Sequence, residues 1–225
     1  MQGSPALIRS TNEAIASRLP LGDIEQGFPG MPGFSKNPED APALEARAIS
    51  ATIDGIRLCS VYVPNGRALD DPHLDYKLRW LSALGEHYRA YREQPGALPF
   101  AIGGDFNIAP QDSDVGDPMF LAPGTTHTSD HERAALTSFL DTAGVLDTVR
   151  PRVPEGYTYW DYKQGKFPKD HGMRIDFIFG SEAFASMVTH ASIERDQRVG
   201  EGPSDHVPVV VELGVEDDFD RPMVF

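Results

Sequence analysis

The sequence has almost no cysteine and no long run of apolar residues. Its 225 residues contain one cysteine, Cys59, so no disulfide can form within the chain. No apolar stretch is long enough to cross a bilayer, and Met1 is not followed by the basic and apolar segments of a secretory signal. We therefore expect a protein of a reducing, cytoplasmic compartment that has no membrane partner.

Positive charge is also scarce. Lys and Arg number 20 against 34 Asp and Glu, which gives a net charge of −14. Proteins that neutralise phosphates usually carry a basic field, so the total charge argues against a nucleic-acid partner. However, carboxylates gathered around a divalent cation do not repel a phosphate once the cation is bound. The distribution of charge therefore matters more than its sum.

Strands and helices alternate along a chain that is 40% hydrophobic, which predicts a single domain over residues 1–225 with a frayed tail at 216–225. β-branched residues on both sides of Gly55 predict a hairpin. The Pro- and Gly-rich segment 22–42 predicts an ordered surface loop. The predicted strands are 46–54, 56–63, 98–102, 174–179, 188–194 and 207–213, and the predicted helices are 72–94 and 132–143. Together these elements predict a layered α/β sandwich with a site along one rim.

Three short segments place polar residues at the ends of apolar strands, namely Gly104–Asn107, Arg174–Phe177 and Ser204–Pro208. Hydrolysis of a phosphodiester needs a cation, a base or orienting group for water, and a donor to the developing oxyanion, and Asp, Asn and His can supply all three. Oxygen ligands favour Mg²⁺ or Mn²⁺ over a structural zinc. Each segment alone is a weak signal, because Asp-X-Asn is more often a turn and an Asp-His pair is more often structural.

The order of these segments resembles the exonuclease III/AP endonuclease branch of the endonuclease/exonuclease/phosphatase superfamily. Tyr62, in Val-Tyr-Val-Pro-Asn-Gly, matches that branch too, and the resemblance runs from about Ala14 to Leu213. It implies a four-layer α/β sandwich of two mixed sheets flanked by helices. It also implies a monomeric, nucleoid-associated enzyme of base excision repair, dependent on Mg²⁺ or Mn²⁺. Such an enzyme cleaves double-stranded DNA 5′ to abasic sites and removes nucleotides or blocking groups from 3′ ends.

The resemblance also implies catalytic roles. His206, oriented by Asp205, would contact the scissile phosphate. Asp105 would activate water or protonate the leaving oxygen, and Asn107 would fix the phosphate or the nucleophile. The metal ligands would come from Asp105, Asn107 and Asp205.

Two further residues complete the catalytic set. Asp176 would orient the site or assist the metal, and Tyr62 would donate a hydrogen bond to the phosphate. In physical terms this is in-line displacement at phosphorus, with the cation and the donors stabilising charge that grows in the transition state.

Residues 157–169 interleave aromatic and basic side chains, which suits insertion at a flipped-out sugar. The segment resembles the family's abasic-pocket loop, with Tyr159 at the position of a stacking aromatic. The alternative for this segment is a core-packing aromatic cluster with solvated lysines. For Arg67 and Lys77, which lie outside the segment, the alternative is that they are exposed loop and helix charges. The predicted DNA-binding residues are Arg67, Lys77, Tyr159, Trp160 and Arg174.

The opening of the sequence departs from the family pattern. Family members begin with a strand bearing an Asn and a second strand ending in a metal-binding Glu, and Asn12 and Glu13 lie too close to the next strand to replace them. We therefore expect an incomplete N-terminus, exposed strand edges and a fragment that could be inactive.

Three other functions are alternatives to this one. Another phosphoesterase of the same superfamily, such as an inositol-phosphate phosphatase or a sphingomyelinase, has no evident use for the aromatic-basic loop. A non-catalytic DNA-binding remnant would bind an abasic duplex in chelator without nicking it. A serine hydrolase is disfavoured because the sequence has no Gly-X-Ser-X-Gly, and Gly202–His206 ends in His where that motif has Gly.

Overall fold

The computed structural model describes residues 6–9, 13–37 and 39–214. The helices are α1 (Pro72–Arg92), α2 (Asp130–Ala143) and α3 (Glu182–Met187), with four short 3-10 turns, η1 (Asp112–Asp114), η2 (Pro118–Leu121), η3 (Lys163–Gly165) and η4 (Arg195–Arg198). The strands are β1 (Ala6–Arg9), β2 (Ala14–Ser17), β3 (Gly22–Gln26), β4 (Ala48–Ile53), β5 (Ile56–Tyr62), β6 (Phe100–Asp105), β7 (Val145–Asp147), β8 (Asp176–Ser181), β9 (Val188–Ile193) and β10 (Val209–Leu213).

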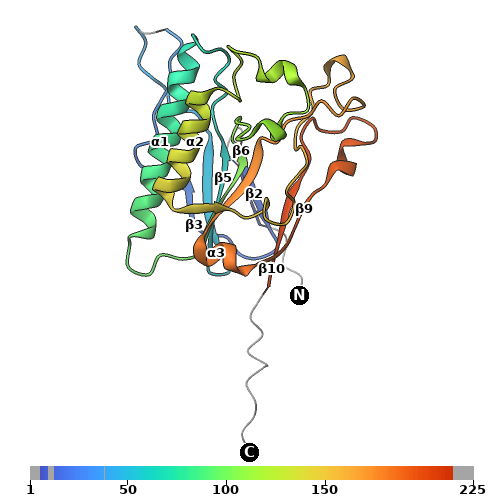
Figure 1. Ribbon diagram of the computed structural model, residues 1–225. Helices are drawn as coiled ribbons and strands as arrows, with labels where there is room; N and C mark the ends of the chain where they lie inside the picture. The colour runs from blue at the N-terminus through green and yellow to red at the C-terminus, as the bar shows by residue number, and fades with distance from the viewer. Residues whose placement is uncertain (1–5, 10–12, 38, 215–225) are drawn as a thin grey trace, which may run out of the picture.

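A mixed six-stranded sheet forms the centre of the fold, in the order β3-β4-β5-β6-β8-β7. Only β5 and β6 are parallel, and they are joined by α1, as a parallel connection requires. Helices α1 and α2 pack together as one layer, while the hairpins β1-β2 and β9-β10 lie elsewhere around the sheet (Figure 1). The predicted α/β sandwich is therefore confirmed. None of the helices in these described ranges has the length and apolar character needed to span a bilayer.

The two long helices are bounded by local signals. Asp71 caps α1 by accepting a hydrogen bond from the backbone N–H of His73, and Pro72 occupies the first turn, where its missing N–H is harmless. Ser129 caps α2 in the same way, and Gly144 ends it in the left-handed region at φ 67°.

The inner faces of α1 and α2 bury large side chains against the sheet. Trp80 and Leu84 from α1 and Phe139 from α2 join Phe177 and Phe179 from β8 in one core cluster. Each such side chain contributes roughly 2–3 kcal/mol on burial. This core holds β5, β6 and β8 in place, and these strands carry the site described below.

Most of the predicted elements are confirmed, with ends that differ by a few residues. The hairpin of β4 and β5 turns at Asp54 and Gly55, both in the left-handed region, as a two-residue turn requires. The prediction of a loop across 22–42 is wrong at its start, because β3 pairs with β4 there and the Arg57 side chain binds both the Asp23 carbonyl and the Glu25 carboxylate. The predicted frayed tail at 216–225 lies outside the described residues.

A cavity of about 600 Å³ lies between the central sheet and the two hairpins. Its walls include Ala14 and Ala16 from β2, Leu58 from β5, and Val211 and Leu213 from β10. Within the described ranges, β2 pairs only with β1, and β10 pairs only with β9. The outer edges of these two hairpins border an apolar space, and the expected loss of N-terminal strands stays a prediction.

Candidate active site

The ends of three neighbouring strands meet at one edge of the central sheet. Tyr62, the last residue of β5, is the register partner of Asp105 at the end of β6, and Asp105 is the register partner of Asp176 at the start of β8. Because β8 runs antiparallel to β6, its beginning lies beside the end of β6. Asp105 and Asp176, two of the side chains predicted to converge, therefore lie side by side on one rim, with Tyr62 next to Asp105.

His206 reaches this rim from the loop before β10. Its backbone forms a bridge with Tyr159, and the backbone N–H of Trp160 donates to the carbonyl of Asp205. The imidazole Nδ1 lies 2.8 Å from Oδ2 of Asp176, and the ring centroid lies 4.8 Å from that of Tyr159. His206 thus binds Asp176 through Nδ1, which leaves its Nε2 for another partner.

The prediction that Asp205 orients His206 is wrong, because the partner is Asp176. Asp205 still contributes charge to the site, since it helps to raise the pKa of His206.

The carboxylates determine the protonation of His206. Burial lowers the pKa of this imidazole, but the hydrogen bond and negative charge of Asp176, with the charges of Asp105 and Asp205, raise it overall to about 9. Burial is also the main reason that the pKa of Asp105 rises to about 7, and the charge of Asp176 adds to the effect. Near neutral pH the site therefore combines an imidazolium donor with a carboxyl group poised to exchange a proton.

Asn107 binds the Asp105 carboxylate from the interior side of the site. Its backbone N–H donates to Oδ1 of Asp105 at 2.7 Å, and its side-chain Nδ2 donates to Oδ2 at 3.0 Å and to the Val63 carbonyl at 3.1 Å. Its Oδ1 accepts from Asn65 at 3.0 Å. Asn107 is 4% exposed and its amide contacts Asp105, so it positions that carboxylate; its predicted binding of the metal or the phosphate stays a prediction.

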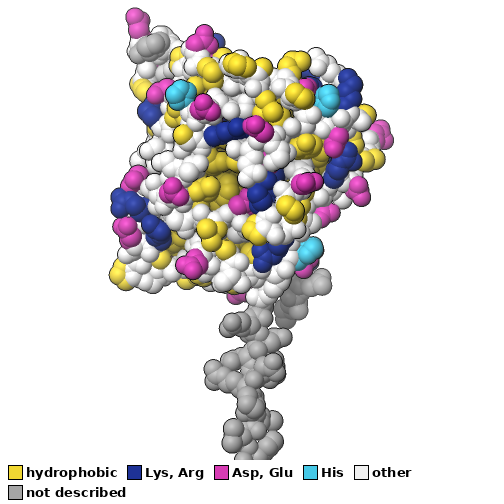
Figure 2. All heavy atoms as spheres, in the orientation of Figure 1, with side chains coloured by type: hydrophobic (Ala, Val, Ile, Leu, Met, Phe, Trp, Pro, Cys, Tyr) yellow, Lys and Arg dark blue, Asp and Glu magenta, His cyan; other side chains and the backbone are white. Residues whose placement is uncertain are grey.

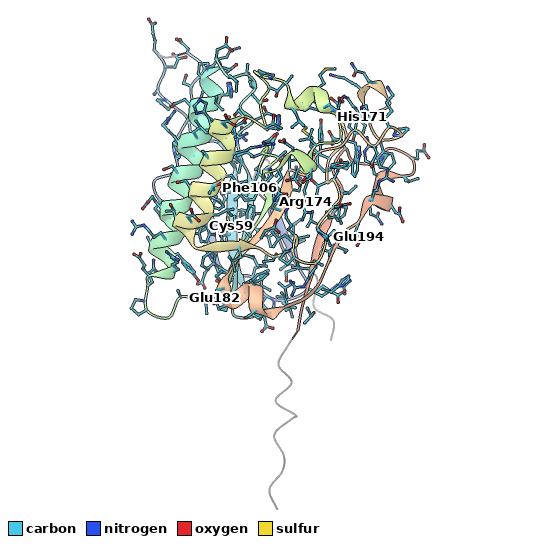
Figure 3. All side chains as sticks on the ribbon, viewed as in Figure 1. Cys59, Phe106, His171, Arg174, Glu182 and Glu194 are labelled. Carbon is cyan, nitrogen blue, oxygen red and sulfur yellow. The ribbon has the colours of Figure 1, made fainter. Side chains whose placement is uncertain are left out.

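Gly104 is required by the close approach of β5 and β6. Its φ is +143°, and a Cβ at this position would lie 1.9 Å from the Val61 carbonyl oxygen. Gly103, one residue earlier, meets nothing closer than 3.6 Å. The Gly-Gly-Asp-Phe-Asn sequence thus places Asp105 at the rim while Phe106 enters the core beside the helices (Figure 3).

Three predicted DNA contacts are wrong because the side chains are buried. Lys77 is fully enclosed, where its Nζ donates to the carboxylate of Glu132 and to the Asn107 carbonyl. Trp160 is 1% exposed and packs between Tyr157 and Phe167. Arg174, labelled in Figure 3, is also 1% exposed, and its Nη1 donates to the Val153 carbonyl.

Two predicted DNA contacts remain predictions. Tyr159 is partly exposed beside His206, and burial followed by nearby carboxylates raises its pKa to about 12, so it keeps its proton. Arg67 is exposed near the same rim, with its backbone N–H bound to the Asn65 side chain. Figure 2 shows basic and acidic side chains intermingled on the face it displays, without a continuous basic field.

Sequence reasoning missed four supporting residues. Glu132 and Thr158 are buried, Thr158 Oγ1 accepts from the backbone N–H of Asp176, and Asn65 and His127 contact the Asn107 amide. Asn65 had a local signal, because it follows Tyr62 by three residues in the quoted motif. The other three had none, since only the packing of distant segments brings them to the site.

The carboxylates fit a divalent cation in charge and in donor type. Burial, and then the negative charge of Asp105, raise the pKa of Tyr62, and Glu13 and Asp205 act on it in the same direction. Glu13 accepts a hydrogen bond from Ser60 at 2.5 Å on the adjacent part of β5. Within the ranges that the structure describes, however, no three His, Cys, Asp or Glu side chains lie close enough together to enclose an ion. Asp105 and Asp205 stay predicted carboxylate ligands of such an ion.

Comparison with known proteins gives a consistent result. A sequence model described as the Endonuclease/Exonuclease/phosphatase family matches residues 14–206. The exodeoxyribonuclease of Bacillus subtilis is 28% identical over 204 residues, which cover 85% of this chain and 77% of that protein.

Two solved structures are also similar to this chain. A 3′ phosphatase, NExo, from Neisseria, determined with a product DNA hairpin, has 35% identity and a TM-score of 0.81, covering 94% of this chain and 80% of that one. An AP endonuclease from Archaeoglobus fulgidus has 28% identity and a TM-score of 0.79, with the same coverage of each chain.

Proposed function

The chain belongs to the Endonuclease/Exonuclease/phosphatase family, and we propose on that basis that it is a DNA-repair phosphodiesterase. It cleaves DNA 5′ to abasic sites and removes nucleotides or blocking groups from 3′ ends. The observation that carries this proposal is the meeting of Tyr62, Asp105, Asp176 and His206 at one sheet edge. The relatives named exodeoxyribonuclease and AP endonuclease support the same reaction class and DNA as the substrate.

We propose that two side chains act as hydrogen-bond donors to the phosphate. His206, kept protonated and held at Nδ1 by Asp176, donates from Nε2 to a non-bridging phosphate oxygen. Tyr62 retains its proton because its pKa is raised, so its hydroxyl donates to the same group. Donors that are already oriented stabilise the charge that develops at phosphorus without reorganisation.

Asp105 acts as the general base or general acid of the reaction. With a pKa of about 7, it takes a proton from the attacking water or gives one to the leaving oxygen. Asn107 occupies both carboxylate oxygens of Asp105 from the interior side, so that the carboxylate keeps one orientation. A fixed base contributes through the near-attack geometry that it enforces.

We also propose that the reaction depends on Mg²⁺ or Mn²⁺, with Asp105 and Asp205 among the ligands. The support is the accumulation of carboxylate charge around Tyr62 and the preference of these ions for oxygen donors. When bound, the cation would offset negative charge on the phosphoryl oxygens.

Incubation of the protein with a duplex containing one abasic site, in Mg²⁺ or in chelator, tests this function. We expect a nick 5′ to the site that requires the divalent ion, and release of phosphate from a 3′-phosphorylated hairpin. His206→Asn should abolish the nick, whereas His190→Asn, a change at an exposed histidine of β9, should not. Binding of the duplex in chelator with no nicking in Mg²⁺ would assign the chain to the non-catalytic DNA-binding class.

A further inference from the structure

We propose that His127 is a positioning residue for the reaction, which holds the Asn107 amide so that Asn107 in turn holds Asp105. The kinetic consequence of this inference rests on the proposed function, whereas the hydrogen bonds among His127, Asn107 and Asp105 do not depend on it. His127 lies in the segment before α2, and its ring contacts Thr126, Asn65 and Asn107 rather than Asp105. Its Nε2 lies 3.1 Å from Oδ1 of Asn107.

The orientation of both amides near His127 follows from their backbone partners. The Nδ2 of Asn107 donates to the oxygens of Val63 and Asp105. The amide atom that faces His127 is therefore the oxygen Oδ1. Oδ1 of Asn65 accepts from the backbone N–H of Arg67, so Asn65 points its Nδ2 at the same oxygen. The Asn107 oxygen is therefore an acceptor for its neighbours.

This arrangement favours one tautomer of His127. Nε2 lies 3.1 Å from the Asn107 oxygen and 3.3 Å from Nδ2 of Asn65, and the shorter contact, which is with an acceptor, favours the ring that carries its hydrogen on Nε2. Nδ1 is then the acceptor and lies 3.1 Å from Oγ1 of Thr126, which can donate to it. Burial and the charge of Lys77 lower the pKa of His127 to about 4, in agreement with a neutral ring.

The backbone at His127 is in a conformation that side chains rarely adopt. Its φ is +73°, in the left-handed region where a Cβ is unfavourable. The carbonyl of His127 accepts from the N–H of Ala109, which connects it to the segment after Asn107. Such a backbone conformation persists only where surrounding contacts impose it, and in this position it directs the ring at the Asn107 amide.

Two substitutions separate the side-chain role from the backbone conformation. His127→Gly removes the ring and relieves the left-handed backbone, so a merely structural histidine would be replaced without loss of function or with a gain of stability. His127→Gln retains a donor near the position of Nε2. Asp54→Gly relieves the same kind of backbone at the distant β4-β5 turn, φ 48°, and serves as the control.

We expect His127→Gly to lower kcat for nicking about tenfold with KM changed less than twofold, which is the effect of one lost buried hydrogen bond on a positioned base. His127→Gln should recover most of the loss, and Asp54→Gly should behave as wild type. Wild-type kcat in His127→Gly, equal loss in kcat and in substrate affinity, or no rescue by Gln would each overturn the proposal.

A spectroscopic readout keeps this test independent of the proposed function. In the wild type, the His127 ring nitrogens should show the Nε2–H tautomer by 15N shifts, and the Asn107 side-chain amide should exchange with water at least tenfold more slowly than in His127→Gly. If the wild type shows no nicking, the proposed function fails, yet slow exchange still supports the positioning role. Equal exchange rates in wild type and His127→Gly would refute it.

Discussion

Nδ1 of His206 lies 2.8 Å from Oδ2 of Asp176, so that the first residue of β8 holds an imidazole from a loop 30 residues later in the chain. The carboxylate determines the direction of the ring and favours its protonated form. Asp205, although adjacent to His206 in the sequence, acts on it only through its charge. This difference leads directly to the first prediction.

Asp176→Asn should lower the pKa of His206 from about 9 toward its ordinary range, because the mutation removes both a hydrogen bond to the charged ring and a negative charge. Nicking at pH 8 should fall by roughly a hundredfold, the order expected when an oriented charged donor is lost. The pKa is measured from the pH dependence of the His206 ring proton signals. Asp205→Asn is the matched control, and a larger shift in that variant than in Asp176→Asn would contradict the assignment.

Stability should decrease as the pH rises through the same range. The pKa of His206 is higher in the folded protein, about 9, than its ordinary value of 6.5, so its contribution to folding is complete below pH 6.5 and is lost as pH approaches 9. The loss should be on the order of 2 kcal/mol at most, since solvent screens a side chain that is partly exposed. Urea unfolding in chelator at several pH values measures it, and His206→Asn should remove that part of the slope. An equal slope in the variant would disprove the linkage.

Lys77→Met should destabilise the fold by about 3–5 kcal/mol, because it leaves the carboxylate of Glu132 buried without its partner. Adding Glu132→Leu should recover part of this loss, since an apolar pair replaces the ion pair. Arg79→Met, which breaks the exposed ion pair with Asp75 on the same helix, should cost less than about 1 kcal/mol. The free energies come from urea unfolding, and similar losses for Lys77→Met and Arg79→Met would show that the Lys77 pair is not buried.

Gly104→Ala should prevent normal folding or reduce stability by more than about 3 kcal/mol, because the new Cβ would overlap the Val61 carbonyl and β5 would have to move. Gly103→Ala is a suitable control, since its Cβ would make ordinary contacts with Ile178. The melting temperature and yield of soluble protein report the difference. Equal behaviour of the two variants would mean that β5 and β6 approach less closely at Gly104.

Much of the fold could be predicted because its signals are local. The caps of α1, the Gly144 end of α2 and the Asp54-Gly55 turn each depend on a few consecutive residues, and the predicted elements there are confirmed. Strand β3 was missed because its pairing depends on Arg57 and β4, whereas the surrounding Pro and Gly residues indicated a loop.

The chemical types at the site were also readable from the chain. Asp105, Asp176, Asp205 and His206 were predicted to meet around one cation-sized gap. The structure brings Asp105, Asp176 and His206 to one sheet edge, but no three acidic or histidine side chains in the described ranges lie close enough together to enclose an ion. Sequence periodicity could not tell whether a basic or aromatic side chain points outward, and it was wrong for Lys77 and Trp160. Lys77 is buried against Glu132, which comes from a segment that the local pattern does not connect to it. Trp160 packs against Phe167 of the same segment, and the pattern does not show which of these rings faces the core.

The sequence by itself determined where the strands end and which acidic, amide and imidazole groups those ends carry, since alternation and capping act over a few residues. Only the tertiary structure decided that His206 is held by Asp176 rather than by adjacent Asp205, and that Asn107 turns inward to Asp105. The reason is that side-chain partners are chosen by the register of neighbouring strands and the loops packed against them, which bring together residues far apart in the chain.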